Sequence, residues 1–503
     1  MGVASTAASP PKGIAGHYLR YSAGSLMGIV AGLISFPILT RLLDNTQYGI
    51  LGYFDTWVLL AVSVAKLGAQ HSLLRLYPHG GDAARMTAFS TNLFYAPLAI
   101  SMGLWLVVAL VLGGLSWVGQ WQHTAMFWLA VLMVPMLVSS SMVEMVLRAM
   151  ENSRLAMLTR VGWRWLELAL ILGCVVLVQQ SALAAYGGRF AAAVLACGFF
   201  YFRWTRRNMR FSRSAVDASE LGRGMAYGLP LVANEMAMVA LVSVDRLMLK
   251  ELMGDYESVG IYTIGASLGM QVSVLLGGTM MEAFAPAANR LFDTSGAEAV
   301  RELKYRVLLV LTYASIAVAV LCGFVGTDLI VALSGPDKAA SGPVFVVMGV
   351  IYALQPVLVI SGYGLLLEKR SMKVLVLMCV AVVVNVIGNL LWIPPYGVMG
   401  AVYATAMSSA VLAISHCVFV QRDLLQLPRL RTVVIAILAA AVAGLVSRAG
   451  SELGVTTGWH RLLVVGPAMA VAYAAIVLGL DRDLRAMLVQ WRHRFAGRSS
   501  GVA

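Results

Sequence analysis

Residues 374–393 read V-L-V-L-M-C-V-A-V-V-V-N-V-I-G-N-L-L-W-I, and none of these twenty residues carries a charge. As a helix, the stretch would be about 30 Å long, which matches the hydrocarbon core of a bilayer. Hydrocarbon offers the backbone no hydrogen-bond partner, so a segment of this length can cross it only as a helix. The stretch therefore predicts a transmembrane helix.

The rest of the 503-residue chain has the same character: 60% of its residues are apolar and 12% are charged, and its mean hydropathy is +0.81. Soluble proteins carry roughly 25% charged residues and need polar side chains to cover their surface. The composition therefore excludes soluble enzymes, disordered chains and secreted disulfide scaffolds. We expect an all-α, multi-pass membrane protein with about fourteen spans, at 18–40, 51–70, 88–112, 125–147, 155–178, 182–202, 226–249, 259–284, 307–325, 342–366, 374–393, 398–420, 432–449 and 461–480.

The positive charges predict how the chain is oriented in the membrane. The formal net charge is +13, from 37 Lys and Arg against 24 Asp and Glu. With a cytoplasmic N-terminus, 28 of the 37 basic residues lie in cytoplasmic segments, six lie in outer segments, and Lys66, Arg164 and Arg189 lie within spans. Basic residues accumulate on the cytoplasmic side of membrane proteins, so we expect both termini to be cytoplasmic. In a bacterium the membrane would be the inner membrane.

The spacing of hydrophilic segments predicts the domain organisation. The longest hydrophilic break follows six spans, so we expect a six-helix lobe over 1–202, a basic cytoplasmic linker over 203–223, and a second six-helix lobe over 224–420. Two further helices and a basic tail would occupy 421–503. No connection is long enough for a sizeable extramembrane domain, which weighs against a glycosyltransferase, a polymerase or a ligase.

No motif for metal, cofactor or nucleotide chemistry is present in the sequence. The five cysteines lie singly in or beside apolar runs, and the seven histidines are scattered without metal-ligand spacing. A G-x-x-x-x-G-K-[ST] motif is also missing, so we do not expect this chain to hydrolyse ATP. We expect no catalytic residues, no metal, no cofactor and no nucleic-acid partner.

Two segments resemble each other and suggest an internal repeat. Thr40 to Tyr53 and Asp245 to Tyr262 each place Arg-Leu and another apolar residue before a short polar loop, and each continues with Gly-Ile into the next span. An even number of spans per half returns the second half to the same side of the membrane. The similarity therefore favours two six-helix halves in parallel orientation.

Three motifs also resemble a known family. They are the run Arg41 to Gly49, the stretch from Tyr227 through Glu235 with D-R-L-M-L-K-E-L-M-G ending at Gly254, and N-V-I-G-N-L-L-W-I-P-P-Y-G-V-M-G-A-V-Y-A-T-A from Asn385 to Ala406. They resemble the polysaccharide transporter family, the lipid-linked oligosaccharide flippases of the multidrug/oligosaccharidyl-lipid/polysaccharide exporter superfamily. The resemblance implies two bundles around a central cavity that opens alternately inward and outward, with the last two spans added to a twelve-helix core.

Four charged residues in the first lobe lie where a charge is costly. A charge at the centre of a membrane helix costs about 2.5 to 3.5 kcal/mol, unless it faces water or another charge. Arg164, Glu167 and Arg189 lie deep in their spans, and Lys66 lies toward the cytoplasmic end of the second. The cations fit a water-filled cavity that binds an anionic head group, because arginine donates two parallel hydrogen bonds to phosphate. The alternatives are an Arg164–Glu167 salt bridge that only locks helices, and snorkelling by Arg189 and Lys66.

Acidic and amide residues in later spans supply candidates for ion coupling and substrate contact. Glu235 has no cation one turn away on its helix, so it needs a partner on another helix or a proton; Asn234 lies beside it. We predict Glu235, Asp245 and Glu167 as ion-coupling residues. An interfacial salt-bridge cluster of Asp245 with Arg246 and Lys250 is the alternative.

The last two candidates are Asn385 and Asn389, which share one face of a helix. They are predicted to contact substrate together with Arg164, Arg189, Lys66 and Asn234. Hydrogen bonding between helices is the alternative for both.

These observations together predict a flippase that moves a polyprenyl-diphosphate-linked oligosaccharide to the outer leaflet for cell-surface polysaccharide synthesis. Membrane lipids, H+ or Na+, and other polysaccharide-assembly proteins are the remaining candidate partners. A membrane potential negative inside favours outward movement of an anion by about 2.3 kcal/mol per charge per 100 mV. The alternatives are a multidrug exporter or a lipid II flippase of the same superfamily, and a membrane enzyme of glycan assembly.

Overall fold

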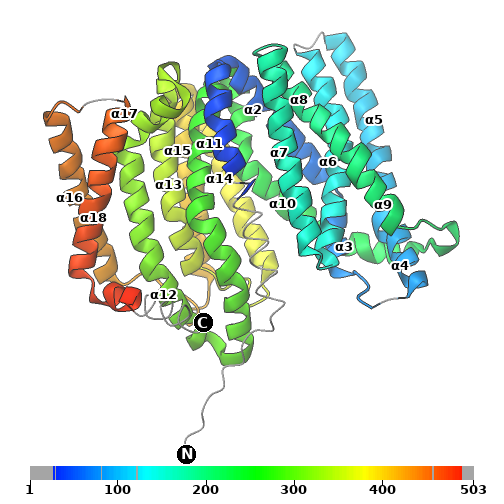
Figure 1. The fold of residues 1–503 in the computed structure, drawn as a ribbon. Coiled ribbons are helices and arrows are strands. Elements are labelled where there is room, and N and C mark those ends of the chain that lie inside the picture. Colours follow the sequence, from blue (N-terminus) through cyan, green and yellow to red (C-terminus); the bar gives the residue numbers. More distant parts are fainter. Residues whose placement is uncertain (1–26, 29, 81, 120–122, 456–457, 490–503) are drawn as a thin grey trace, which may run out of the picture. The chain divides into compact units, whose positions relative to one another are not determined.

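The computed structural model describes residues 27–28, 30–80, 82–119, 123–455 and 458–489. Within these ranges the chain forms helices joined by short turns and contains no strand (Figure 1), which confirms the all-α prediction. The helices group into two compact units. Unit 1 comprises the described residues up to Leu43 and Tyr53–Ala240, and unit 2 comprises Asp44–Gly52 and the described residues from Leu241 onward.

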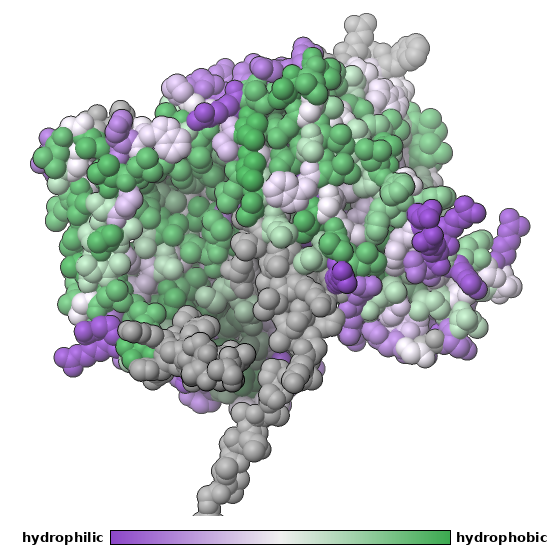
Figure 2. Space-filling model, viewed as in Figure 1, coloured by the Kyte–Doolittle hydropathy of each residue, from purple (hydrophilic) through white to green (hydrophobic). Residues whose placement is uncertain are grey.

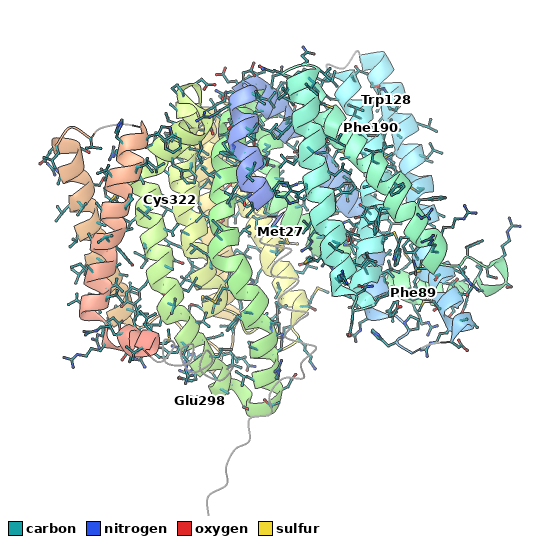
Figure 3. The ribbon with its side chains drawn as sticks, viewed as in Figure 1. Met27, Phe89, Trp128, Phe190, Glu298 and Cys322 are labelled. Carbon is teal, nitrogen blue, oxygen red and sulfur yellow. The ribbon has the colours of Figure 1, made fainter. Side chains whose placement is uncertain are left out.

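Eleven helices in the described part of the chain are long and apolar enough to cross a membrane. The prediction of about fourteen spans counts three more, for different reasons. The helix Val30–Leu42 is shorter than a full span, and α7 (Ser153–Leu177) carries four charged residues. The run Tyr256–Ser334 counts as one of the eleven helices, although its 79 residues are far more than one span needs. That run leaves the helical conformation at Gly296 (φ 78°, ψ −168°), so it contains two of the predicted spans. Glu298 marks this turn in Figure 3.

Unit 1 contains the first group of helices and the π-helical and 3-10 turns that interrupt them. After Val30–Leu42 they are α2 (Asn45–Ala65, whose first residues belong to unit 2), α3 (Ala69–Arg75), α4 (Ala83–Phe89), η1 (Ser90–Tyr95), α5 (Ala96–Gly119), α6 (Thr124–Ala149), α7, α8 (Ala182–Leu195), η2 (Ala196–Tyr201), α9 (Phe202–Asn208), η3 (Arg213–Ala215) and the first part of α10 (Ala218–Met253).

A break between α2 and α3 positions the first candidate residues. The predicted span 51–70 would pass through it, but α2 ends at Ala65, and both Leu67 (φ 50°) and Gly68 (φ 70°) adopt the left-handed conformation. Gly68 also lies directly against Gly228 of α10: a Cβ atom built on Gly68 would be 2.1 Å from the Gly228 carbonyl oxygen. The backbone of α10 therefore reaches the broken helix only because both positions are glycine.

Unit 2 contains the helices that follow α10. They are α11 (Tyr256–Ser273), η4 (Val274–Gly278), α12 (Thr279–Ser334), η5 (Pro336–Ser341), α13 (Gly342–Ser361), α14 (Ser371–Tyr396), α15 (Val398–Phe419), α16 (Leu430–Glu452), α17 (Gly458–His460), η6 (Arg461–Val465) and α18 (Gly466–Leu480).

The glycines of the suspected repeat meet in unit 2. A Cβ atom on Gly49 would be 1.8 Å from the Tyr256 carbonyl oxygen, and one on Gly260 would be 1.8 Å from the Asn45 carbonyl oxygen. The start of α2 therefore packs backbone to backbone on α11. The corresponding Gly-Ile positions of the two repeat segments lie against each other.

The last two long helices pack on one helix of the unit 2 core. Figure 1 shows α16 and α18 side by side next to α12. Tyr313 of α12 and Tyr473 of α18 lie in one buried apolar cluster, and the Tyr473 hydroxyl donates to the Tyr313 carbonyl at 3.0 Å. This packing gives the two helices beyond the predicted twelve-helix core a fixed place on α12.

Candidate functional site

Four charged side chains of unit 1 form one cluster, which we call the unit 1 charge cluster: Asp55 of α2, Arg164 and Glu167 of α7, and Arg189 of α8. Arg189 Nε lies 3.0 Å from Glu167 Oε1, and Arg189 Nη1 donates to Asp55. Arg164 Nη1 donates to Glu167 Oε2 at 3.2 Å. Two cations and two carboxylates balance to zero, which lowers the cost of keeping them within the membrane.

The two arginines of this cluster differ in how firmly they are held. The Arg189 side chain is 27% exposed, contacts carboxylates from two helices and lies over the Tyr186 ring, with 5.6 Å between its guanidinium carbon and the ring centroid. The Arg164 side chain is 48% exposed and contacts one carboxylate, although it lies near the middle of α7. Arg164 therefore keeps donors that a further anion can use.

The sequence placed Arg164 and Glu167 on one helix face, and the structure pairs them. It also brings in Asp55 and Arg189, which the sequence could not assign to each other across 134 residues. Arg189 reaches carboxylates within the helices, so its contacts differ from those expected of a snorkelling side chain. Whether the cluster binds substrate stays a prediction.

A second ion pair of unit 1 lies at the break after α2. Lys66 Nζ donates to Glu235 Oε1 of α10 at 2.8 Å, and Gln70 of α3 donates to Glu235 Oε2. Glu235 thus has a cationic partner from the break between α2 and α3, outside its own helix, which agrees with one of the two states that the sequence allowed. Asn234 is half-buried beside it.

His71 follows Gln70 and lies outside the predicted spans. Burial lowers the pKa of His71, with Glu235 opposing this shift and Lys66 adding to it. A neutral imidazole can accept a hydrogen bond, and the Gln70 amide nitrogen lies 3.3 Å from His71 Nε2.

The third group surrounds Asp245 in unit 2, and we call it the Asp245 site. Asp245 is fully buried near the end of α10. Its Oδ1 accepts a hydrogen bond from Asn389 of α14 at 2.6 Å. Its Oδ2 accepts from Thr405 of α15 at 2.7 Å and from Tyr262 of α11 at 2.5 Å. Three helices thus direct neutral donors at one carboxylate.

The two asparagines predicted from α14 belong to this site. Asn389 Nδ2 also donates to Asn385 Oδ1 at 3.1 Å, and both residues are fully buried. Asn389 Oδ1 is buried and has no hydrogen-bond partner among the residues that the structure describes. The asparagines therefore join helices in this state, as the helix-bonding alternative expected, and they leave one amide oxygen beside Asp245 unsatisfied.

These contacts contradict the alternative of an interfacial salt-bridge cluster. Within the described residues Asp245 makes no ion pair, and Lys250 instead donates to the Gly254 carbonyl at 2.8 Å. The reason is position: Asp245 points into the packed helices, whereas Lys250 lies one turn further along α10. Sequence reasoning missed Tyr262 and Thr405, although both lie in quoted motifs, because single hydroxyl residues are common in membrane helices.

The fold is similar to that of several solved membrane transporters. A lipid II flippase MurJ in an inward closed conformation superposes with a TM-score of 0.66 at 11% identity, covering 93% of this chain and 99% of that one. An inward-facing multidrug resistance MATE family transporter of the MOP superfamily gives a TM-score of 0.59 at 14% identity, over 79% and 96%. A MOP superfamily transporter from Pyrococcus furiosus gives 0.56 at 13% identity, over 85% and 96%. At these identities the likeness concerns the fold.

No curated protein matches the sequence. A family model described as polysaccharide biosynthesis protein matches residues 19–292, which is more than half of the chain and includes the unit 1 charge cluster, the Lys66–Glu235 pair and Asp245. The match agrees with the resemblance carried by the motifs around Arg41, Tyr227 and Asp245. This multi-pass membrane protein belongs to the polysaccharide biosynthesis protein family.

Proposed function

We propose that this protein is a flippase that moves a polyprenyl-diphosphate-linked oligosaccharide from the cytoplasmic to the outer leaflet. Its family and its MurJ-like and MATE-like fold support transport. The observation that carries the proposal is Arg164, a half-exposed arginine near the middle of α7, the helix of the predicted span 155–178.

The exposure of Arg164 argues for a polar surface at membrane depth. A guanidinium facing hydrocarbon would cost several kcal/mol, so the exposed half of Arg164 needs water or a polar ligand. Glu167 orients the side chain through one nitrogen, and the remaining donors match the planar geometry of phosphate oxygens. A diphosphate is therefore the group that we expect Arg164 to bind, while the polyprenyl chain stays in lipid.

Arg189 has a supporting role in this proposal. It neutralises Glu167 and Asp55, so the carboxylates beside Arg164 repel an incoming anion less strongly. Outward movement of the diphosphate would also be favoured by a membrane potential negative inside.

Ion coupling is assigned in this proposal to Asp245. Of the three predicted carboxylates, Glu167 and Glu235 already contact cations, whereas Asp245 contacts neutral donors among the described residues. A buried carboxylate without a cationic partner is costly even when it is hydrogen-bonded, so a bound cation would stabilise it. The free Asn389 Oδ1 and the Thr405 hydroxyl would add oxygen ligands for Na+, which is then a transported ion.

The test follows the lipid-linked glycan with a membrane-impermeant probe, in cells that lack this protein. Wild type, Arg164→Ala and Arg154→Ala are compared at equal expression. Arg154 is an exposed arginine in the first turn of the same helix, so its replacement removes the same charge away from membrane depth. We expect wild type and Arg154→Ala to restore the outer-leaflet signal, and Arg164→Ala to lower it by more than about tenfold.

Other outcomes would select among the alternatives. An outer leaflet that fills without the protein, while polymer is lost, would replace the proposal by a membrane enzyme. Accumulation of lipid II in the inner leaflet would identify that lipid as the substrate. Unchanged glycan placement with increased drug sensitivity would indicate a multidrug exporter.

A further inference from the structure

The helix α8–η2–α9 is longer than the membrane needs. It runs from Ala182 to Asn208 without interruption, and these 27 residues span about 40 Å. The hydrocarbon core takes about 30 Å, so the final turns of the helix extend into the head-group region. The basic segment that follows therefore begins at the end of a helix, at the membrane surface on the side predicted to be cytoplasmic.

The segment after α9 is held against η1 by specific hydrogen bonds. Asn92 donates to the Ala215 carbonyl and to Glu220 Oε2, both at 2.9 Å, and its Oδ1 accepts from the Asp217 amide at 2.9 Å. Thr91 Oγ1 accepts from the Ser212 amide at 3.1 Å. Asn92 and Thr91 are buried. The predicted linker is therefore docked on unit 1 over these residues.

The basic side chains of α9 and this segment stay exposed on its outer surface. Five arginines of α9 and the docked segment are exposed, and none forms an ion pair within the part of the chain that the structure describes: Arg203, Arg206, Arg207, Arg210 and Arg213. The nearby acids are engaged, because Glu220 accepts from Asn92 and Asp217 caps the Ser219 amide at 2.8 Å. Figure 2 shows the hydrophilic side chains gathered over α9 and the loop after it.

Large apolar side chains lie among these arginines. Phe199, Phe202 and Phe211 are 78%, 64% and 55% exposed. Exposed phenylalanine is costly in water but favourable at the boundary between head groups and acyl chains. Phe199 and Phe202 lie at the end of the predicted span 182–202, but Phe211 lies beyond it, and a soluble polyanion would use the charges and leave this ring in water. A membrane surface with anionic lipids would contact both the arginine charges and the phenylalanine rings.

We propose that α9 and the docked segment through Arg213 form a binding surface for anionic phospholipid head groups of the cytoplasmic leaflet. Arginines of a preformed surface bind phosphate oxygens without first ordering the backbone, since the hydrogen bonds of Asn92 and Thr91 already hold it. Phe199, Phe202 and Phe211 place this surface at the depth of the phosphates. Each arginine should strengthen association with an anionic membrane about fivefold.

The experiment measures lipid binding to the purified full-length protein by native mass spectrometry, with phosphatidylglycerol and phosphatidylcholine as probes. The test variant is Arg206→Gln/Arg207→Gln. The control variant is Arg301→Gln/Arg306→Gln, which removes two arginines that already pair with Glu298 and Glu302. We expect the test variant to bind phosphatidylglycerol more than about tenfold more weakly than wild type. Phosphatidylcholine binding, and phosphatidylglycerol binding to the control variant, should change little.

Equal loss of phosphatidylglycerol binding in both variants would overturn the proposal, because it would reflect net charge alone. So would unchanged lipid binding together with a loss of glycan flipping in cells, which would point to a protein partner at this surface. Should the double variant fail to fold, the single variants Arg206→Gln and Phe202→Ser test the charge and the aromatic contact separately. The lipid measurement needs no transport, so its result is independent of the proposed flippase function.

Discussion

The unit 1 charge cluster and the Asp245 site stabilise charged side chains among membrane helices by different contacts. In unit 1, the charges of two arginines and two carboxylates sum to zero, and the Arg164 side chain stays half-exposed. In unit 2, one carboxylate is fully buried among neutral donors from three helices. A balanced, partly exposed cluster can exchange one anionic partner for another. A buried carboxylate without a cationic partner can instead gain a cation.

The largest effect should come from removing the cation that balances unit 1. Arg189→Ala leaves the half-buried Asp55 without its cation and the buried Glu167 with Arg164 alone, and removing one partner of such an ion pair costs about 3 kcal/mol. We expect a clear drop in melting temperature in detergent. Arg448→Ala is the control, because Arg448 pairs with Glu452 on an exposed surface and should change stability by less than about 0.5 kcal/mol. Equal melting temperatures for the two variants would contradict the balance described for unit 1.

Two aspartate-to-asparagine changes compare the units directly. Asp55→Asn removes a carboxylate that Arg189 needs, so it should destabilise the protein. Asp245→Asn removes an unbalanced charge, and the new amide can donate to the free Asn389 Oδ1, so the fold should be retained. Flipping in proteoliposomes by Asp245→Asn should lose its dependence on the coupling ion. A strong ion dependence in this variant would move the coupling role elsewhere.

A double-mutant cycle tests whether the Lys66–Glu235 pair behaves like the rest of unit 1. Lys66→Met and Glu235→Gln should each destabilise the protein, and the double variant should recover part of the loss. The coupling free energy should be about 1 kcal/mol, against about 0.3 kcal/mol for the exposed Arg306–Glu302 pair. Purely additive losses would show that the pair contributes nothing to folding.

The smallest effect concerns the geometry of the substrate donor. Arg164→Lys keeps the charge but loses the planar fork, so flipping should fall by roughly fivefold while the melting temperature stays unchanged. Initial rates at equal protein density provide the measurement. Full activity would mean that charge alone matters at this position.

Local patterns in the sequence predicted the fold well. Apolar runs such as Val374 to Ile393 identify spans because hydrocarbon permits few alternatives to a helix. The pairing of Arg164 with Glu167 followed from their spacing on one helix. The break at Leu67 and Gly68 was missed, since the apolar run continues across it and only contact with α10 explains the turn.

The long-range contacts of the candidate sites were not predictable from one sequence. Lys66 and Glu235 are 169 residues apart, and their individual positions say only that each needs a partner. Tyr262 and Thr405 carry no charge to mark them, so their approach to Asp245 depends on how α11 and α15 pack. Contacts along one helix follow from the spacing of residues in the sequence. A site built from four helices can be predicted only when the packing of those helices is known.

The close approach of Gly68 and Gly228 fixes the rotation of α10 about its own axis. Glu235 lies seven positions, about two helical turns, after Gly228. Because the two glycine backbones touch, this count fixes the direction in which the Glu235 carboxylate points toward Lys66. One inserted residue between them would turn it by about 100°. The number of residues between Gly228 and Glu235 is therefore as constrained as the identity of the two glycines.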